Sequence, residues 1–196
     1  MKRKKFISGL LTGALVLTSV TGFGVSKVNA AEDDNLVAYY TFDGENLANS
    51  QKESEAAQPM QARASTSTEM TDYTGDVSYD ADGFKGGAVR LGDYGLRLNQ
   101  ENLGENFTVS MWLKADGTFA ENQVLAYLGY HKDPENWIAV SGKTTGTSAC
   151  KFWANGGQYV DNEKWHTFNE TVISSKEWHQ LTLTGSEDEV AAYLDG

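Results

Sequence analysis

Aromatic side chains are the residues of this sequence whose type and spacing most readily suggest chemistry. The chain of 196 residues has five Trp, nine Tyr and eight Phe, and rings at the rim of a site can stack on the apolar faces of sugars. Trp112 lies on the polar side of the alternating stretch Phe107–Lys114, so we expect it away from the core or beneath a covering loop. Further candidates for sugar binding lie near predicted strand ends: Tyr130, Trp137 and Trp153. Each ring alone is explained as well by core filling or loop bracing.

A calcium site is the second candidate, at Asp43 and Gly44. These residues follow an aromatic stretch that has the composition of a strand, and Ca²⁺ prefers carboxylate and backbone oxygens as ligands. An Asp-Gly pair is equally typical of an ordinary turn, and both interpretations stay open. Asp93 and Asp195 are weaker candidates because they too lie at predicted turns.

Catalytic constellations are not evident in the sequence. A glycoside hydrolase needs two carboxylates that flank the scissile bond, but the one dense acidic run, Glu187–Glu189, falls in a predicted turn between strands. The pairs Trp165-His166 and Trp178-His179 lack partners at metal-ligand spacing, and we interpret the second pair as packing at the start of a strand. Cys150 is the single cysteine, which rules out an intrachain disulfide and a Cys-cluster zinc site.

The N-terminus has the pattern of an export signal. Met1–Lys5 is basic, Phe6–Val25 is apolar, and Val28–Ala30 supplies small residues for cleavage before Ala31. Residues 1–30 are therefore predicted to be a cleaved signal peptide of Gram-positive character, followed by an acidic lead-in over 31–35. We expect a secreted protein.

The charge balance narrows the classes of partner. The full chain has 16 Lys and Arg against 27 Asp and Glu, a net charge of −11. Residues 1–30 contain five of these cations and no acid, so the remainder has 11 cations against 27 acids, or −16. Such a surface repels nucleic acid and anionic membranes. It suits a neutral ligand or calcium.

Short alternating segments predict the fold class. Residues 46–72 are polar and read as a long surface loop with a short helix over 52–57, and both prolines fall in predicted loops. Many short strands separated by turns, without a long helical pattern, predict an all-β protein with an antiparallel two-sheet sandwich. The predicted strands are 36–42, 88–91, 94–98, 107–114, 124–130, 137–141, 150–153, 167–173, 181–184 and 190–194.

Three ordered stretches resemble a known family. They are "LVAYYTFDGENLANS", then "GFKGGAVRLGDYGLRL" with "ENFTVSMWLKADG", and finally "KEWHQLTLTGSEDEVAAYLDG". Together they resemble the laminin G-like, concanavalin A-like jelly-roll domains over residues 36–196. The resemblance implies an accessory module of bacterial polysaccharide-degrading enzymes. It also implies a structural calcium ion near Asp43, held partly by a final strand.

The C-terminus departs from this family. Asp195-Gly196 is a strong hairpin-turn signal, and domains of this type continue beyond it. We therefore expect a fragment whose last strands are missing. The functional hypothesis is a non-catalytic module that binds a polysaccharide or another extracellular ligand, as the N-terminal part of a larger secreted glycan-degrading protein with a C-terminal catalytic domain. The alternatives are an adhesion or structural module and, third, a glycoside hydrolase.

Overall fold

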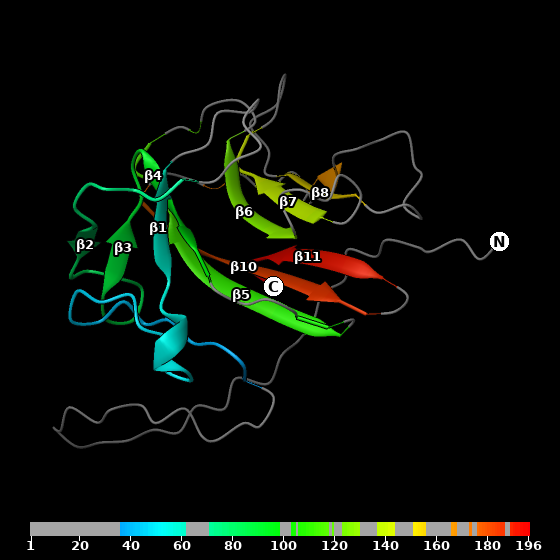
Figure 1. The fold of residues 1–196 in the computed structure, drawn as a ribbon. Helices are drawn as coiled ribbons and strands as arrows, with labels where there is room; N and C mark the ends of the chain where they lie inside the picture. Colours follow the sequence, from blue (N-terminus) through cyan, green and yellow to red (C-terminus); the bar gives the residue numbers. More distant parts are fainter. Residues whose placement is uncertain are drawn as a thin grey trace, which may run out of the picture. The chain divides into compact units, whose positions relative to one another are not determined.

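The computed structural model describes the chain in several stretches (Figure 1). They are residues 36–61, 71–98, 103–104, 106–117, 119, 123–129, 137–143, 151–155, 166–167, 173, 176–186 and 189–196. The predicted signal peptide and acidic lead-in lie outside these residues. The described part of the chain is all-β apart from one short 3₁₀ turn, and no helix in it has the length and apolar character that a membrane crossing requires. The chain divides into one unit that includes Leu103–Gly196 and another that covers Gly13–Asn102.

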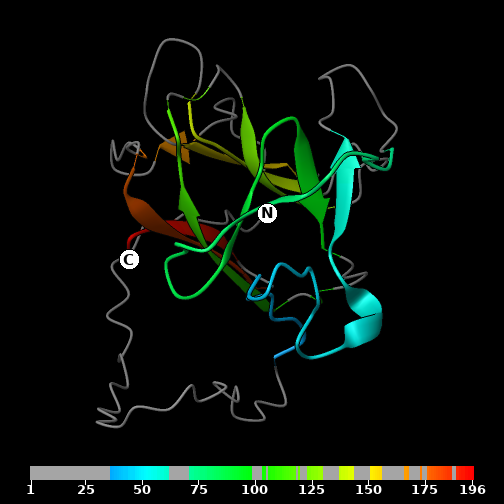
Figure 2. The same ribbon diagram turned by 90° about the vertical axis from the view of Figure 1, so that its left-hand side faces the viewer.

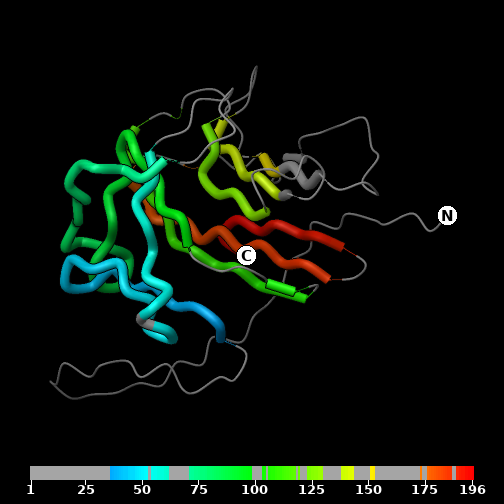
Figure 3. Tube along the Cα trace, viewed as in Figure 1, coloured from blue at the N-terminus to red at the C-terminus, as the bar shows by residue number. Residues whose placement is uncertain are grey.

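The unit that includes Leu103–Gly196 contains an antiparallel three-stranded sheet. Its strand order is β11-β10-β5, and the three strands lie side by side in Figures 1 and 3. β5 spans Phe107–Lys114, β10 spans Trp178–Gly185 and β11 spans Val190–Leu194. In the register, Trp178 pairs with Lys114 at one end of β10 and Gly185 pairs with Phe107 at the other.

A four-stranded antiparallel sheet forms the second layer of the same unit. Its order is β6-β7-β8-β9, and Figure 2 shows it as a layer separate from the three-stranded sheet. The strands are β6 (Val124–Gly129), β7 (Trp137–Ser141), β8 (Lys151–Asn155) and β9 (His166–Thr167). A bulge lies between Val124 and Ala126 in the pairing of β6 with β7.

Apolar residues of the two sheets form one core. Leu181 and Leu183 of β10 are fully buried, and they belong to the same cluster as Val140 of β7 and Phe152 of β8. Met111 of β5 packs against this cluster. The predicted antiparallel two-sheet sandwich is thus confirmed in this unit, because burial of one apolar face from each sheet is the main force that holds such layers together.

Most strand predictions for this unit agree with the structure. The exceptions are the predicted strand 181–184, which is the middle of the longer β10, and the predicted strand 167–173, where β9 covers only His166–Thr167 and Ile173 lies outside a strand. β5, β7 and β11 have their predicted bounds, and β6 and β8 differ from them by two residues at most. The alternation in β5 is visible in its exposure: Thr108, Ser110 and Trp112 are exposed, whereas their neighbours are partly buried. A strand with one face on a core must alternate in this way, since successive side chains point to opposite faces.

The unit that covers Gly13–Asn102 has two small antiparallel sheets. β1 (Gln58–Gln61) pairs with β4 (Tyr94–Arg97), and β2 (Ser78–Asp80) pairs with β3 (Ala88–Arg90). The ring of Tyr94 is buried and stacks on the ring of Tyr73 with 4.6 Å between centroids. The Tyr94 hydroxyl accepts from the N–H of Ser78 and donates to the carbonyl of Arg90, so a single tyrosine ties β4 to the β2–β3 hairpin.

The predicted strand over residues 36–42 is wrong, since the structure has no strand there. A strand requires a neighbouring strand to pair with its backbone groups. Here the loop that follows supplies hydrogen-bond partners for the Tyr39 backbone instead. The Tyr39 N–H donates to the Oδ1 of buried Asn49 at 3.0 Å, and the Tyr39 carbonyl accepts from the Ser50 N–H at 2.8 Å. The segment is therefore held by the Asn49 side chain and one backbone bond to Ser50 rather than by a strand ladder.

The predicted long loop over residues 46–72 is only partly a loop. It contains the 3₁₀ turn η1 (Glu53–Glu55), which lies within the predicted helix, and it contains β1. Ala57 and Met60 are each 4% exposed. These two buried apolar side chains anchor the otherwise polar segment. The hydrogen bonds between β1 and β4 join backbone groups, so they need no further apolar side chains. Pro59 consequently lies in a strand and not in a loop.

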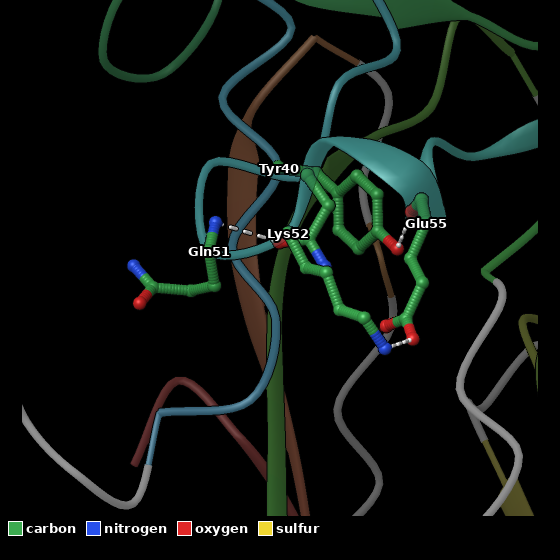
Figure 4. A network of polar contacts seen from close by, with 5 residues as sticks. Tyr40, Gln51, Lys52 and Glu55 are labelled. Atoms are coloured by element: carbon green, nitrogen blue, oxygen red, sulfur yellow. Dashed lines mark hydrogen bonds and ion pairs between the residues drawn. The ribbon is translucent and has the colours of Figure 1, made fainter.

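Polar contacts fix the start of this segment (Figure 4). The Asn49 Oδ1 also accepts from the Gln51 N–H at 3.0 Å. Tyr40 donates from its hydroxyl to the carbonyl of Glu55 at 2.9 Å, and Lys52 forms an ion pair with the Glu55 carboxylate. Glu55, the last residue of η1, is thus held through its carbonyl by Tyr40 and through its carboxylate by Lys52.

We predict that Tyr73 ionises at higher pH than an ordinary tyrosine. Partial burial against Tyr94 raises the pKa of the Tyr73 phenol, and the nearby Asp93 carboxylate raises it further. A raised pKa means that the protonated phenol stabilises the fold below about pH 10, and that this contribution is lost as the pH rises through the folded-state pKa. Tyrosine-ring NMR titration of the parent and Tyr73→Phe would identify the resonance. Asp93→Asn should lower the pKa, and an unchanged titration would contradict the assigned cause.

Candidate functional site

Trp112 lies where its strand parity predicted, on the face of the three-stranded sheet that points away from the core. Its side chain is 43% exposed, although most large apolar side chains are buried in such sheets. The adjacent core residues Met111 and Leu113 point to the opposite face and pack against the cluster. The position of an exposed tryptophan on a rigid strand is fixed by the core behind it.

Hydrogen-bonding side chains flank Trp112 on the same face. Gln180 of β10 is its cross-strand partner, and Ser110 pairs with Thr182 one step along the sheet. The Gln180 amide donates from Nε2 to the Ser110 Oγ at 3.1 Å, and the Ser110 and Thr182 hydroxyls are 3.1 Å apart. The three groups therefore hold one another in place, and each hydroxyl retains a lone pair for a further partner.

Two more rings occupy this face. Trp178 begins β10 opposite Lys114, and the Lys114 ammonium lies 4.9 Å from the centroid of the Trp178 ring. Tyr193 of β11 pairs with Thr182 and is partly exposed. We call this surface the Trp112 face. It comprises Ser110, Trp112, Lys114, Trp178, Gln180, Thr182 and Tyr193.

The start of the central strand β10 is fixed by His179 and Asp195. The His179 ring is 8% exposed, and its Nδ1 lies 2.7 Å from the Asp195 Oδ2. Asp195 also accepts from the Gln180 N–H at Oδ1 and donates its own N–H to the Gln180 carbonyl, both at 2.9 Å. The prediction that Trp178-His179 starts a strand and packs there is confirmed. These contacts fix the backbone of Gln180, the partner of Trp112.

The other predicted sugar-binding residues are distributed differently. Tyr130 lies outside the described residues. Trp137 begins β7 and Trp153 lies within β8, so both belong to the four-stranded sheet, whereas Trp112 belongs to the three-stranded one. The backbone thus assigns the predicted group to two sheets, and the role of Trp137 and Trp153 stays a prediction.

Asp43 and Gly44 form a tight turn. The Asp43 Oδ1 accepts from the Gly87 N–H at 2.6 Å, and the Asp43 carbonyl accepts from the Asn46 amide at 2.7 Å. Gly44 has φ +66°, and a Cβ on Gly86 would lie 2.2 Å from the Asp43 carboxylate. The Asp43 carboxylate therefore joins this turn to the backbone of Gly87, and the glycines allow the close approach.

Calcium at this turn stays a prediction. Ca²⁺ takes six to eight oxygen ligands, and the described residues contain no group of three or more His, Cys, Asp or Glu that could hold a metal. The two weaker candidates have other partners, since Asp93 accepts from the Tyr73 hydroxyl and Asp195 bonds His179. The residues described around Asp43 do not by themselves complete a calcium site.

Sequence reasoning identified Trp112 but not its neighbours. Ser110 was visible on the same side of its strand, but Gln180, Thr182 and Tyr193 lie about 70 to 80 residues later in the chain. Only the register of β10 against β5 and β11 brings them beside Trp112. The alternation within each strand can be recognised in the sequence, whereas the pairing of one strand with another cannot.

Comparisons with known proteins support the fold. No protein-family model matches the sequence, and no curated protein matches it in sequence. Among solved structures, the chain is similar to domain 4 of AbnA, a GH43 extracellular arabinanase from Geobacillus stearothermophilus, solved in complex with arabinotriose. The similarity has a TM-score of 0.61 at 21% identity and covers 80% of this chain and 69% of that chain. At this identity it establishes likeness of fold alone.

Proposed function

We propose that this protein is a non-catalytic carbohydrate-binding module and that the Trp112 face is its binding surface. The observation that carries the proposal is an exposed tryptophan on a rigid sheet beside a fixed row of hydroxyl and amide groups. Fold similarity to an arabinanase domain that was solved with arabinotriose supports a glycan as ligand.

Each part of the face has a role in binding. The Trp112 ring provides an apolar platform for the C–H face of one sugar unit, which removes apolar surface of both partners from water. Gln180, Ser110 and Thr182 provide donors and acceptors for sugar hydroxyls. These groups are already ordered by their mutual hydrogen bonds, so little side-chain entropy is lost on binding.

The face is suited to binding rather than to hydrolysis. Catalysis by a glycoside hydrolase needs a pair of carboxylates at the scissile bond. The core-averted positions of β5 and β10 carry Thr, Ser, Trp, Lys and Gln but no Asp or Glu. Among the three hypotheses, the enzymatic one therefore has the least support on this face, and adhesion to another protein is the main rival.

The proposal also covers the export of the module and the longer protein to which it belongs. The predicted signal peptide favours export, and the similar structure is domain 4 of an arabinanase that is described as extracellular. We propose that the chain is secreted as the N-terminal part of a larger glycan-degrading protein, with a catalytic domain elsewhere in the chain. The jelly-roll topology and a structural calcium ion are part of the same proposal.

Tryptophan fluorescence can test the binding surface directly. All five Trp lie between residues 112 and 178, so emission reports on the sandwich unit alone. We expect at least one member of a panel of arabino-, xylo-, galacto- and uronate oligosaccharides to bind in calorimetry and to change the emission. Trp112→Phe should keep affinity within a few-fold, because a ring remains for stacking, but should lose most of the emission change. An unchanged signal would show that Trp112 is not the reporting ring, and a panel without any binder would contradict the function.

A further inference from the structure

Lys114 is the one charged residue of the Trp112 face. Its ammonium lies over the Trp178 ring at 4.9 Å, and its side chain is partly buried. The described ion pairs join Lys52 to Glu55, Arg90 to Asp80 and His179 to Asp195. None of them includes Lys114. In the part of the chain that the structure describes, this cation is positioned by an aromatic ring and not by an acid.

The ring contact, and not the lack of an acid, distinguishes Lys114. Although the sequence has 27 Asp and Glu, only Lys52 and Arg90 among the Lys and Arg of the described residues form ion pairs with a carboxylate. Among the same residues, Lys114 is the one whose ammonium is placed over an aromatic ring. No carboxylate occupies the core-averted positions of β5 or β10. Asp195, just after β11, is already bonded to His179 and to the Gln180 N–H. A cation–π contact orients an ammonium but leaves its charge uncompensated.

Lys114 is also close to the proposed sugar platform. It follows Trp112 by two residues on the same face of β5, which corresponds to about 7 Å along the strand. Trp178 lies across from Lys114, and Gln180 lies across from Trp112. A sugar unit stacked on Trp112 would therefore have its neighbouring unit, or its own substituent, within reach of the ammonium.

We propose that the ligand of this face is an acidic glycan, and that Lys114 binds a uronate carboxylate of a sugar next to the one stacked on Trp112. This inference rests on the proposed function and deepens it. The overall negative charge of the protein does not oppose it strongly, because exposed charges farther than about 8 Å away are largely screened at physiological ionic strength. The local contact is a charge-assisted hydrogen bond, which is about twice as strong as a neutral one.

Matched ligand pairs can test the proposal. Oligosaccharides from polygalacturonate, alginate and glucuronate-substituted xylan would each be compared by calorimetry with their carboxyl-reduced counterparts, which keep the ring and linkage and lose the charge. At least one acid should bind the parent protein about tenfold more tightly than its reduced form. Lys114→Gln should bring that ratio close to one, because it removes the charge that distinguishes the acid from its reduced form. Lys114→Arg should retain the preference for the acid.

A charge control and a folding control complete the design. Lys151→Gln removes the same charge from β8 in the other sheet and should keep the tenfold ratio. Thermal unfolding of each variant should match the parent. If every acid binds no more tightly than its reduced form, or if the preference persists in Lys114→Gln, the proposal is wrong while the Trp112 site can stand on neutral ligands. If neither acidic nor neutral oligosaccharides bind, this proposal and the proposed function both fail.

Discussion

Replacing Trp112 with alanine should remove most of the glycan affinity of this protein and leave its fold intact. Truncation of a central aromatic residue at a binding site commonly costs about 2 kcal/mol or more, which is roughly a thirtyfold increase in Kd. The ring lies on the face away from the core, so the packing between the two sheets is kept. Calorimetry with the best-binding oligosaccharide would measure the affinity, and thermal unfolding would measure the stability.

Tyr127→Ala provides a matched control for this prediction. Tyr127 is also 43% exposed, but it lies on β6 in the four-stranded sheet. Loss of an exposed ring there should leave the affinity within a few-fold of the parent. Equal losses in the two variants would contradict a specific role of the Trp112 face. Unchanged affinity in Trp112→Ala would move the binding surface elsewhere, for example to the predicted aromatic residues Trp137 and Trp153.

Leu181→Ala should cause the largest loss of stability. Leu181 is fully buried between the two sheets, in the middle of β10, which pairs with both β5 and β11. Removal of a buried leucine side chain costs about 2–5 kcal/mol, because both burial and the packing around the remaining cavity are lost. Urea unfolding followed by tryptophan emission would measure this loss in the sandwich unit, since all five Trp lie within Leu103–Gly196.

Thr184→Ala serves as the comparison for Leu181. Thr184 lies on the same strand but on the face away from the core, opposite Thr108. Its replacement should cost at most about 1 kcal/mol, the full span of strand propensities. Similar losses in the two variants would contradict the assignment of β10 faces. Leu181→Ala should also weaken glycan binding once unfolding sets in, because β10 carries Gln180 and Thr182.

Agreement between sequence and structure was greatest where one strong pattern decided the outcome. The alternation of Phe107–Lys114 gave both the bounds of β5 and the exposed position of Trp112. Agreement was poorest before residue 73. The aromatic run at 36–42 has strand composition, but its Tyr39 N–H bonds the buried Asn49 side chain and its Tyr39 carbonyl bonds Ser50. The polar run that follows contains β1, because pairing with β4 depends on backbone groups that composition does not reveal.

The sequence by itself determined the all-β class, the core-facing and solvent-facing sides of each alternating strand, and the candidacy of Trp112 and Asp43. These follow from local periodicity and residue chemistry, which need no knowledge of distant partners. Only the tertiary structure decided the order and register of the strands. Through that register, Gln180 and Thr182 lie beside Trp112 and Ser110, and Trp178 lies beneath the Lys114 ammonium. Pairing between distant strands depends on the packing of the whole core, so the composition of the Trp112 face could not be derived from either strand alone.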